Sequence, residues 1–568
     1  MRIALARLDG TVGDLPGNAR AIADRAVALA SAGADCVAFA EMALCGYPPR
    51  DLLQRGGFVD GCERAVRALA ADLAARGAGR AAVLVGLPMR TGPGGAPVNA
   101  VAVLRGGRVE ASYAKRLLPD YDVFDEPRHF APGAAPCTFE CGGLRVGIVV
   151  CEDLWRAEDA SAAGRTYAAD PVLETAAAGA QAIVCPSASP FAVGKHARHL
   201  EILAAAARRA GVPVCAVNAL GANDDLVFDG DARAVAPDGR TLAAAARWTD
   251  EPLTVDLPGA RVPAANAALA PAAAPDAGHH AERWHAIVAG IRGYVRKSGH
   301  RELVLGLSGG IDSALVGALA AAAVGGERVT GLLMPSRHSS AGSLADAHEL
   351  ARRTGIRAVE LPIAPAHDAL AAHLAPSFAA AGIALEGIAD ENLQSRLRGL
   401  QAMAWSNATG ALVLTTGNKS EYAVGYATLY GDMCGALAPI GDVLKTDVWA
   451  LARWANANHA ALGLARPPVP ESSIDKPPSA ELRPGQTDQD SLPPYEALDA
   501  IVRGWVEEER DVDAIAAAAG IDRATVARWT RAIDLAEFKR RQAPVILRLS
   551  ARAFGPGRRM PVVMRDSR

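Results

Sequence analysis

A stretch of small and proline residues near the middle of the chain constrains the fold more than any other feature of the sequence. Residues 258–280 read PGARVPAANAALAPAAAPDAGHH, a composition that buries too little apolar surface to offset the entropy of ordering. Because the chain has 568 residues, more than one hydrophobic core normally supports, we expect a domain on each side. The sequence therefore predicts a domain over residues 1–257, a linker over 258–280 and a second domain over 281–568.

Composition and charge narrow the class of protein. Half of the residues are hydrophobic and 21% are charged, which is typical of a soluble globular protein. The net charge of −3 and the lack of a broad basic stripe argue against a nucleic-acid partner. No apolar run approaches the ~20 residues that a bilayer requires, and Arg7 and Asp9 interrupt the first apolar run. We therefore expect neither a membrane span nor a secretory signal.

The nine cysteines indicate the redox setting. Their number is odd, their spacing is irregular and no CxxC pair occurs, so the sequence predicts neither a disulfide framework nor a zinc site. Free thiols favour a reducing, cytoplasmic location. The sequence offers no reason to expect haem or flavin either.

Both halves show the pattern of α/β folds. In the first half, short apolar runs such as CVAFA, RVGIVV and AIVCPS alternate with segments of helical periodicity. Glu41, Cys151 and Ser187 follow or end such runs, where α/β folds collect functional residues. In the second half, a helix precedes the strand Glu302–Leu307, a glycine-rich turn and a βαβαβ order, which predicts a doubly wound parallel sheet.

Three segments of the first half carry residues suited to amide hydrolysis. They are FAEMALCGYPPRDLL with Glu41, YAKRLLPDYDVFDEPRHF with Lys115, and VGIVVCEDLW with Cys151. Hydrolysis through a thioester needs a nucleophile, a base that removes its proton and a donor that stabilises the oxyanion. Cys151, Glu41 and Lys115 supply these three functions in turn.

These segments resemble the nitrilase superfamily, which uses a Glu–Lys–Cys triad in this chain order. The resemblance covers most of residues 1–255 and implies an α/β/β/α sandwich. GYPPRDLL and LLPDYDVFDEPRHF are similar to the glutaminase domain of NAD⁺ synthetases in particular. That likeness implies that Tyr121, Ser189 and Lys195 bind glutamine. Where relatives usually read FDGGS, this chain has FDGDA around Asp231, and no role is carried to that position.

LVLGLSGGIDSALV is the strongest short motif of the second half. A buried strand runs into a glycine-rich turn that opens a helix, so backbone N–H groups and the helix N-terminus can bind phosphate. No GK[ST] follows, so this is not a Walker loop. The pattern SGGxDS resembles the N-type ATP pyrophosphatases, which adenylate a substrate and release pyrophosphate. We expect ATP to contact Gly306, Leu307, Ser308, Gly309, Gly310, Ile311, Asp312, Ser313 and Thr416.

A carboxylate within an anion-binding turn is explained if a cation lies between it and the triphosphate. We therefore expect Mg²⁺ to bind Asp312, with Glu421 of TTGNKSEYAVGY as the second carboxylate.

Further segments resemble NAD⁺ synthetases, among them ENLQSRLRG, LTTGNKSEYAVGYATLYGDMCGAL and PPSAELRPGQTDQDSLPPYEALD. The resemblance implies that Asn392, Arg396, Glu421 and Lys539 contact deamido-NAD⁺. It also implies a reaction in which ammonia from L-glutamine converts deamido-NAD⁺ to NAD⁺ through an adenylated intermediate, and a homo-oligomer. Residues 475–490 are polar and rich in proline, and we interpret them as a lid over ATP.

Three alternatives remain at this point. Residues 511–542 have the spacing of a helix-turn-helix with a basic tail, which is also the pattern of two packed helices joined at a glycine. The same two domains could adenylate a different carboxylate. The first domain could also be a scaffold in an enzyme that uses free ammonia, although intact Glu41, Lys115 and Cys151 argue against this.

Overall fold

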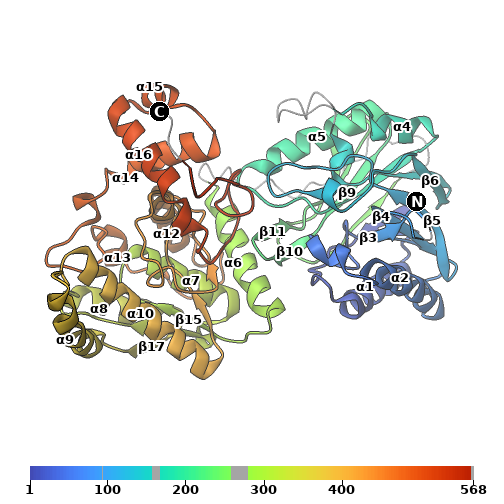
Figure 1. Cartoon of the computed structure of the whole chain (residues 1–568). Coiled ribbons are helices and arrows are strands. Elements are labelled where there is room, and N and C mark those ends of the chain that lie inside the picture. Colours follow the sequence, from blue (N-terminus) through green and yellow to red (C-terminus); the bar gives the residue numbers. More distant parts are fainter. Residues whose placement is uncertain (93, 156–166, 258–278, 565–568) are drawn as a thin grey trace. The chain divides into compact units, whose positions relative to one another are not determined.

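The computed structural model describes residues 1–92, 94–155, 167–257 and 279–564. The chain forms two compact units, Met1–Pro275 and Asp276–Arg568 (Figure 1). Residues 258–278, nearly all of the predicted linker, lie outside the described residues, and His280 already begins a helix. Each unit has its own sheets and its own hydrophobic core.

Two six-stranded sheets form the centre of the first unit. Their facing surfaces share one buried apolar cluster that includes Ile3, Val146 and Val184. In spatial order the first sheet contains β14 (Leu253–Asp256), β1 (Arg2–Leu5), β2 (Cys36–Ala38), β3 (Ala82–Arg90), β4 (Pro97–Arg105) and β5 (Arg108–Ala114). The second contains β13 (Thr241–Ala244), β12 (Ala232–Val235), β9 (Val214–Asn218), β8 (Ala182–Ser187), β7 (Leu144–Ile148) and β6 (Cys137–Cys141). A hairpin of β10 (Leu220–Asn223) and β11 (Leu226–Asp229) stands apart.

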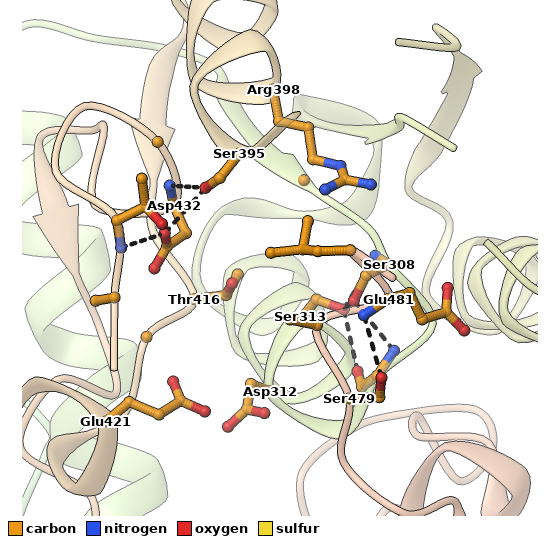
Figure 2. Close-up of a pocket in the computed structure, with 18 of the residues that line it drawn as sticks. Ser308, Asp312, Ser313, Ser395, Arg398, Thr416, Glu421, Asp432, Ser479 and Glu481 are labelled. Atoms are coloured by element: carbon orange, nitrogen blue, oxygen red, sulfur yellow. Dashed lines mark hydrogen bonds between the residues drawn. The ribbon is translucent and has the colours of Figure 1, made fainter. Parts of the chain in front are cut away.

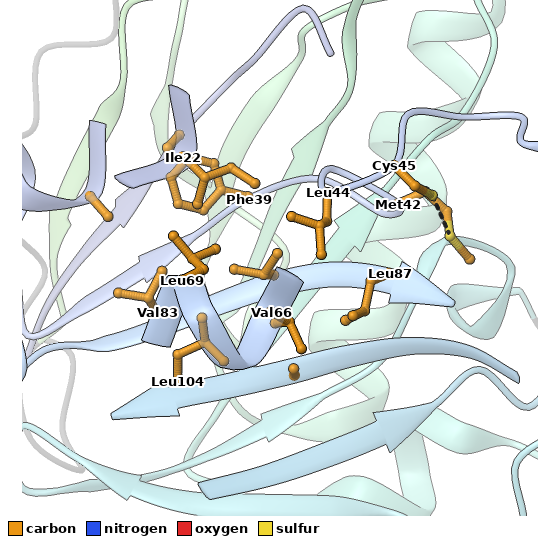
Figure 3. Packing of buried hydrophobic residues seen from close by; sticks show 14 of the residues in the cluster. Ile22, Phe39, Met42, Leu44, Cys45, Val66, Leu69, Val83, Leu87 and Leu104 are labelled. Carbon is orange, nitrogen blue, oxygen red and sulfur yellow. Dashed lines mark hydrogen bonds between the residues drawn. The ribbon is translucent and has the colours of Figure 1, made fainter. Parts of the chain in front are cut away.

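Helices cover the outer face of each sheet. On the first sheet, α1 (Leu15–Ser31) and α2 (Phe58–Ala75) contribute Ile22, Val66 and Leu69 to a cluster with Val83 and Leu104 (Figure 3). On the second sheet, α4 (Pro171–Ala177) and α5 (Lys195–Ala210) pack in the same way. This arrangement is the α/β/β/α sandwich that the resemblance implied. Short 3₁₀ turns are η1 (Arg50–Gln54), η2 (Glu126–Arg128) and η3 (Cys151–Leu154).

The second unit contains one six-stranded parallel sheet, as predicted. Its spatial order is β17 (Arg357–Glu360), β16 (Val329–Leu333), β15 (Leu303–Gly306), β18 (Leu412–Leu414), β19 (Leu437–Ala438) and β20 (Val545–Ile546). The helices are α6 (His280–Lys297), α7 (Ile311–Val324), α8 (Ala341–Thr354), α9 (Ala364–Ala380), α10 (Ile388–Thr409), α11 (Lys419–Val424), α12 (Lys445–Ala457), α13 (Glu471–Asp475), α14 (Tyr495–Val502), α15 (Val512–Ala519), α16 (Arg523–Leu535) and α17 (Glu537–Arg540). Shorter helical turns are η4 (Gly326–Arg328), η5 (Asp488–Asp490) and η6 (Arg503–Glu507).

The strand order of this sheet reverses beside β15. The chain proceeds from β15 to β16 and β17 on one side, and then returns to β18 on the other. Because the connections diverge there, the carboxyl ends of β15 and β18 border a crevice, which is where open α/β sheets bind ligands.

The C-terminal helix pair packs into the second unit. Val512, Ile515, Val526, Trp529 and Ile533 of α15 and α16 join a buried cluster with residues of α14. The packing explains the apolar spacing that also fits a helix-turn-helix, so DNA binding is not needed to account for it.

A close backbone contact positions the segment that follows β2. The carbonyl of Gly86 on β3 accepts a hydrogen bond from the N–H of Leu44 at 3.0 Å. A Cβ atom on Gly86 would lie 2.4 Å from the backbone nitrogen of Met42 and 2.8 Å from the Cα of Glu41. Only glycine therefore allows β3 to approach the segment that carries Glu41 this closely.

Replacing Gly86 with alanine should lower the free energy of unfolding by about 3 kcal/mol, because neighbouring backbone has to move. Thermal unfolding measures the loss. Gly56→Ala is the matched control, because a Cβ there meets nothing within 4 Å and should leave the melting temperature nearly unchanged. Equal melting temperatures for the two variants would contradict this account.

Candidate active sites

Glu41 and Lys115 form a buried ion pair in the first unit. Glu41 follows β2, and Lys115 follows β5 directly. The Nζ of Lys115 donates to Oε1 of Glu41 over 2.8 Å, and each side chain is 1% exposed. The second carboxylate oxygen, Oε2, accepts the backbone N–H of Ala188 at 2.8 Å. The ends of three strands thus hold one carboxylate in a fixed orientation.

Cys151 lies at a sharp turn shortly after β7. Its φ is 47°, in the left-handed region that residues other than glycine rarely adopt. The buried carboxylate of Asp153 braces the turn, because it accepts the backbone N–H of Val150 at 3.0 Å. It also accepts the N–H groups of Arg116 at 3.1 Å and Leu117 at 2.9 Å. Asp153 therefore ties the cysteine turn to the segment that follows β5.

The electrostatic surroundings of Cys151 show that it needs a base. Burial raises the pKa of its thiol, the carboxylate of Glu41 raises it further, and the ammonium of Lys115 opposes these effects. The thiol is therefore protonated in the free protein, and a thiolate forms only when a neighbouring group takes the proton. Glu41 and Lys115 are in contact with each other, and both act electrostatically on Cys151.

Glu126 joins this site, although the sequence reasoning did not select it. Its Oε1 accepts from Nζ of Lys115 at 2.9 Å and from the hydroxyl of Tyr47 at 3.1 Å. Two carboxyl groups thus share one buried ammonium. Burial raises the pKa of Glu126 to about 7, with Lys115 opposing and Glu41 adding to the rise. Glu126 lies in the segment FDEPRHF, but nothing in that segment distinguishes a buried acid from an ordinary acid on the surface.

Two tyrosine hydroxyls hold the carboxyl group of Glu152, the residue next to Cys151. The carboxylate of Glu152, which is buried, accepts the hydroxyl of Tyr121 at 3.0 Å and that of Tyr167 at 2.7 Å. Tyr121 was predicted at this site, whereas Glu152 was missed despite its place next to the cysteine.

Ser189 and Lys195 are brought together at a small pocket. The Nζ of Lys195 donates to Oγ of Ser189 at 2.8 Å and to the carbonyl of Pro190 at 3.0 Å. Asp231 also lines this pocket and pairs with Arg233 at 3.1 Å.

A cavity of about 720 Å³ lies at the reversal of strand order in the second unit (Figure 2). Its wall includes most of the predicted ATP residues, from Gly306 to Ser313, together with Thr416. Gly309 is the exception, because its left-handed φ of 78° places it against α8, where a Cβ would lie 2.1 Å from the carbonyl of Ser343. Its role is to let the turn pass close to α8.

Hydroxyl groups shape the glycine-rich turn. Oγ of Ser313 accepts the N–H of Ser308 at 3.2 Å and donates to the carbonyl of Gly310 at 3.0 Å. These hydrogen bonds link the beginning of the turn to the first residues of α7. The N-terminal end of α7 faces the cavity with its partial positive charge, as an anion site requires.

Lys445 binds the two carboxylates that were predicted to bind a metal. Its Nζ lies 2.5 Å from Oδ2 of Asp312 and 3.3 Å from Oε1 of Glu421, and its side chain is 1% exposed. Burial raises the pKa of Glu421 to about 8, which Lys445 opposes and Asp312 increases. The sequence reasoning missed Lys445, because a lysine in IGDVLKTDVW shows no sign of its partners.

The remaining predicted residues divide into two groups. Asn392, Glu421 and Lys539 line the cavity, and Nζ of Lys539 donates to the carbonyls of Gly425 and Ala427, each at 2.7 Å. Arg396 is not among the lining residues, and its Nε donates to the carbonyl of Leu429 at 3.2 Å.

The segment interpreted as a lid contributes one wall of the cavity. Residues 476–483 belong to the lining, among them Ser479 and Glu481 (Figure 2). Oγ of Ser343 donates to Oε1 of Glu481 at 2.7 Å. Only one short helical turn, η5, forms between Lys476 and Asp490. The segment therefore contacts α8 beside the glycine-rich turn.

Within the described parts of the chain, no group of three or more His, Cys, Asp or Glu side chains is placed to hold a metal. In the same ranges no helix is long and apolar enough to cross a membrane. All nine cysteines are free thiols.

Glu126→Gln should stabilise the protein at neutral and higher pH. Because the folded pKa of Glu126 is raised to about 7, its favourable contribution is present below about pH 4.5 and is lost as the pH rises through 7. Glutamine cannot ionise, so the melting temperature of the variant relative to wild type should rise between pH 5 and pH 8. If the difference in melting temperature stays constant over this range, ionisation of Glu126 does not destabilise the folded protein.

The comparisons with known proteins agree for both units. The model of carbon-nitrogen hydrolases matches residues 2–267, and the model of NAD synthases matches residues 283–543. The solved glutamine-dependent NAD⁺ synthetase of Acinetobacter baumannii, in complex with ADP, is 32% identical, with a TM-score of 0.74 over 99% of this chain and 98% of its own. That of Cytophaga hutchinsonii has a TM-score of 0.80 at 21% identity over 99% and 98%, and it shows the same fold.

Curated relatives match along the entire length. The glutamine-dependent NAD(+) synthetase of Xanthomonas campestris is 44% identical over 99% of this chain and 97% of its own. The synthetases of a Synechocystis species and of Thermotoga maritima are 40% and 38% identical, and the alignments cover at least 98% of each chain. The chain belongs to the family of glutamine-dependent NAD(+) synthetases.

Proposed function

We propose that the first unit releases ammonia from L-glutamine and that the second unit uses it, with ATP, to convert deamido-NAD⁺ to NAD⁺. The observation that carries this proposal is the buried Glu41–Lys115 pair acting on Cys151, in one chain with an SGGIDS turn that lines a cavity. No observation favours a different carboxylate substrate or a DNA-binding role.

Glutamine binding uses one charge of each sign. The substrate carries an α-ammonium and an α-carboxylate group. Glu152, held by Tyr121, is the partner for the ammonium group. Lys195, held at Ser189, is the partner for the carboxylate group. The side-chain amide then lies toward Cys151.

The amide is cleaved in two steps. Glu41 takes the proton of the Cys151 thiol, the thiolate attacks the amide carbon, and Lys115 stabilises the charge that develops on the oxygen. The proton returns to the leaving nitrogen, which departs as ammonia. Glu41 next activates a water molecule that hydrolyses the thioester, and glutamate leaves.

The second unit makes the acceptor reactive. Its glycine-rich turn and the N-terminal end of α7 hold the phosphates of ATP. The nicotinate carboxylate of deamido-NAD⁺ attacks the α-phosphorus, and pyrophosphate leaves. Ammonia attacks the adenylated carboxyl carbon and AMP leaves, which gives NAD⁺. Asn392 and Lys539 line the same cavity and hold the dinucleotide. Arg396 is proposed to contact it as well.

Asp312 and Glu421 fit a Mg²⁺ ion that is bound together with ATP. They converge on Lys445, so their oxygens already share one positive charge. Carboxylate oxygens are ligands that Mg²⁺ prefers, so Asp312 and Glu421 would hold the ion. When bound, the ion neutralises charge on the phosphates. Lys445 holds the two carboxylates in place.

We further propose that the protein forms a homo-oligomer and is located in the cytoplasm. Tyr430, Leu535 and Phe538 are 66%, 55% and 46% exposed. Large apolar side chains of this kind favour pairing between second units of two copies, as expected for a homo-oligomer. Free thiols favour the cytoplasm.

Cys151→Ala should abolish NAD⁺ formation from glutamine while leaving formation from ammonium salts unchanged, because only the first reaction needs the nucleophile. The measurement follows amide-¹⁵N glutamine into NAD⁺ together with pyrophosphate release. Cys137→Ala, another thiol of the same unit outside the site, is the control and should retain both activities. If Cys151→Ala still transfers the label, the proposed glutaminase is wrong.

Asp312→Asn should lower NAD⁺ formation from either nitrogen source about 100-fold and should raise the Mg²⁺ concentration needed for half-maximal rate. The loss follows because one of the two carboxylates can no longer bind the cation. Asp368→Asn changes a carboxylate that is 68% exposed and should behave as wild type. An unchanged Mg²⁺ dependence in the Asp312 variant would exclude it as a ligand.

A further inference from the structure

Asn99 contacts both charged members of the buried pair in the first unit. It lies on β4 and is fully buried. Its side-chain Nδ2 donates to Oε1 of Glu41 over 2.6 Å. Its backbone carbonyl accepts the N–H of Lys115 at 2.7 Å. One residue therefore places the carboxylate and the segment that carries its cation.

The hydrogen bonds make the two oxygens of Glu41 unequal. Oε1 accepts from Asn99 at 2.6 Å and from Lys115 at 2.8 Å. Neither an amide N–H nor an ammonium group can accept a proton in return. Because a carboxylate oxygen has two lone pairs, Oε1 is saturated. Among the described residues, Oε2 accepts only the N–H of Ala188, at 2.8 Å, so one of its lone pairs is open.

The amide of Asn99 has one orientation that fits. If it were reversed, Oδ1 would lie 2.6 Å from the ionised carboxylate and would repel it. In the orientation present, Oδ1 is buried and has no hydrogen-bond partner within the described chain. An unpaired buried acceptor is unfavourable, so Oδ1 of Asn99 lowers the stability of the folded protein. The hydrogen bond from Nδ2 of Asn99 to Glu41 offsets this loss.

We propose that Asn99 is a positioning residue that keeps Oε1 of Glu41 occupied, so that Oε2 is the atom that receives the proton of Cys151. The inference rests on the proposed glutaminase function. In the step, the S–H bond of Cys151 breaks and its proton bonds to Oε2. The thiolate then attacks the amide carbon, and the same proton passes from Oε2 to the leaving nitrogen.

Without Asn99, Oε1 loses a donor that favours the charged form of the carboxylate. A lone pair of Oε1 also becomes open, so the proton of Cys151 is no longer directed to Oε2. The ionisable groups that act on Glu41 or are acted on by it are Lys115, Glu126, Tyr47, Cys151 and Cys185.

The test compares Asn99→Leu, Asn99→Asp and Asn18→Leu in the full-length protein. Asn18 is a matched control, because it is a buried asparagine of the same unit that donates to the carbonyls of Thr11 and Leu44, at 2.8 and 3.1 Å, and does not contact Glu41. The measurement is kcat/KM for glutamine hydrolysis as a function of pH, with NAD⁺ formation from ammonium salts as an internal standard.

We expect Asn99→Leu to lower kcat at neutral pH about tenfold or more, and to move the acidic limb of the profile about one unit upward. KM should change little. Asn99→Asp should move the limb further, because two carboxylates in contact share one proton. Asn18→Leu should lower the melting temperature and leave the limb in place.

The inference is overturned if both Asn99 variants keep the acidic limb of wild type, or if Asn18→Leu moves it equally. Asn99→Asp preserves the shape of the side chain. If Asn99→Leu does not yield folded protein, the pH profile of Asn99→Asp therefore tests the proposed role of Asn99. Cys151→Ala separates this outcome from failure of the glutaminase itself. If that variant is inactive with glutamine while the Asn99 profiles are unchanged, only the role of Asn99 is wrong.

Discussion

The buried ammonium of Lys115 is the interaction on which the first site depends. It lies between Glu41 and Glu126, at 2.8 and 2.9 Å, and no more than 5% of any of the three side chains is exposed. A buried carboxylate without a partner would be protonated, and could not act as a base. One cation is shared by two carboxyl groups. Glu41 accepts two further, uncharged N–H donors, from Asn99 and Ala188, in addition to Lys115.

The second unit also contains a buried lysine that is shared by two carboxyl groups. Lys445 lies between Asp312 and Glu421, and burial again raises the pKa of one carboxyl group, here Glu421 to about 8. A shared ammonium keeps two acids together in a cavity that must also admit phosphates. Under the proposed function, the acid of the first site accepts a proton from a thiol, and the acids of the second site accept a cation that binds with the nucleotide.

Strand ends bring both sets of residues together. The first site combines segments that follow β2, β5, β7 and β8, and the second combines the turns after β15 and β18. Strands that run in parallel end at the same edge of a sheet, so residues far apart in the chain meet there. Close packing at Gly86 and Gly309 brings the loops near enough for hydrogen bonds. A side chain at either glycine would displace a functional segment.

The amino-acid pattern alone predicts two domains, a parallel sheet in the second, and the residues with a distinctive local pattern. Cys151 after a buried strand and the SGGIDS turn are recognisable because their chemistry depends on neighbours in sequence. The contacts of Asn99, Glu126 and Lys445, in contrast, become visible only in the folded chain. Each of them works through a partner more than ten residues away, at distances of 2.5 to 2.9 Å. A buried polar side chain is defined by its partners, and those are set when the strands pack, so no local pattern marks it.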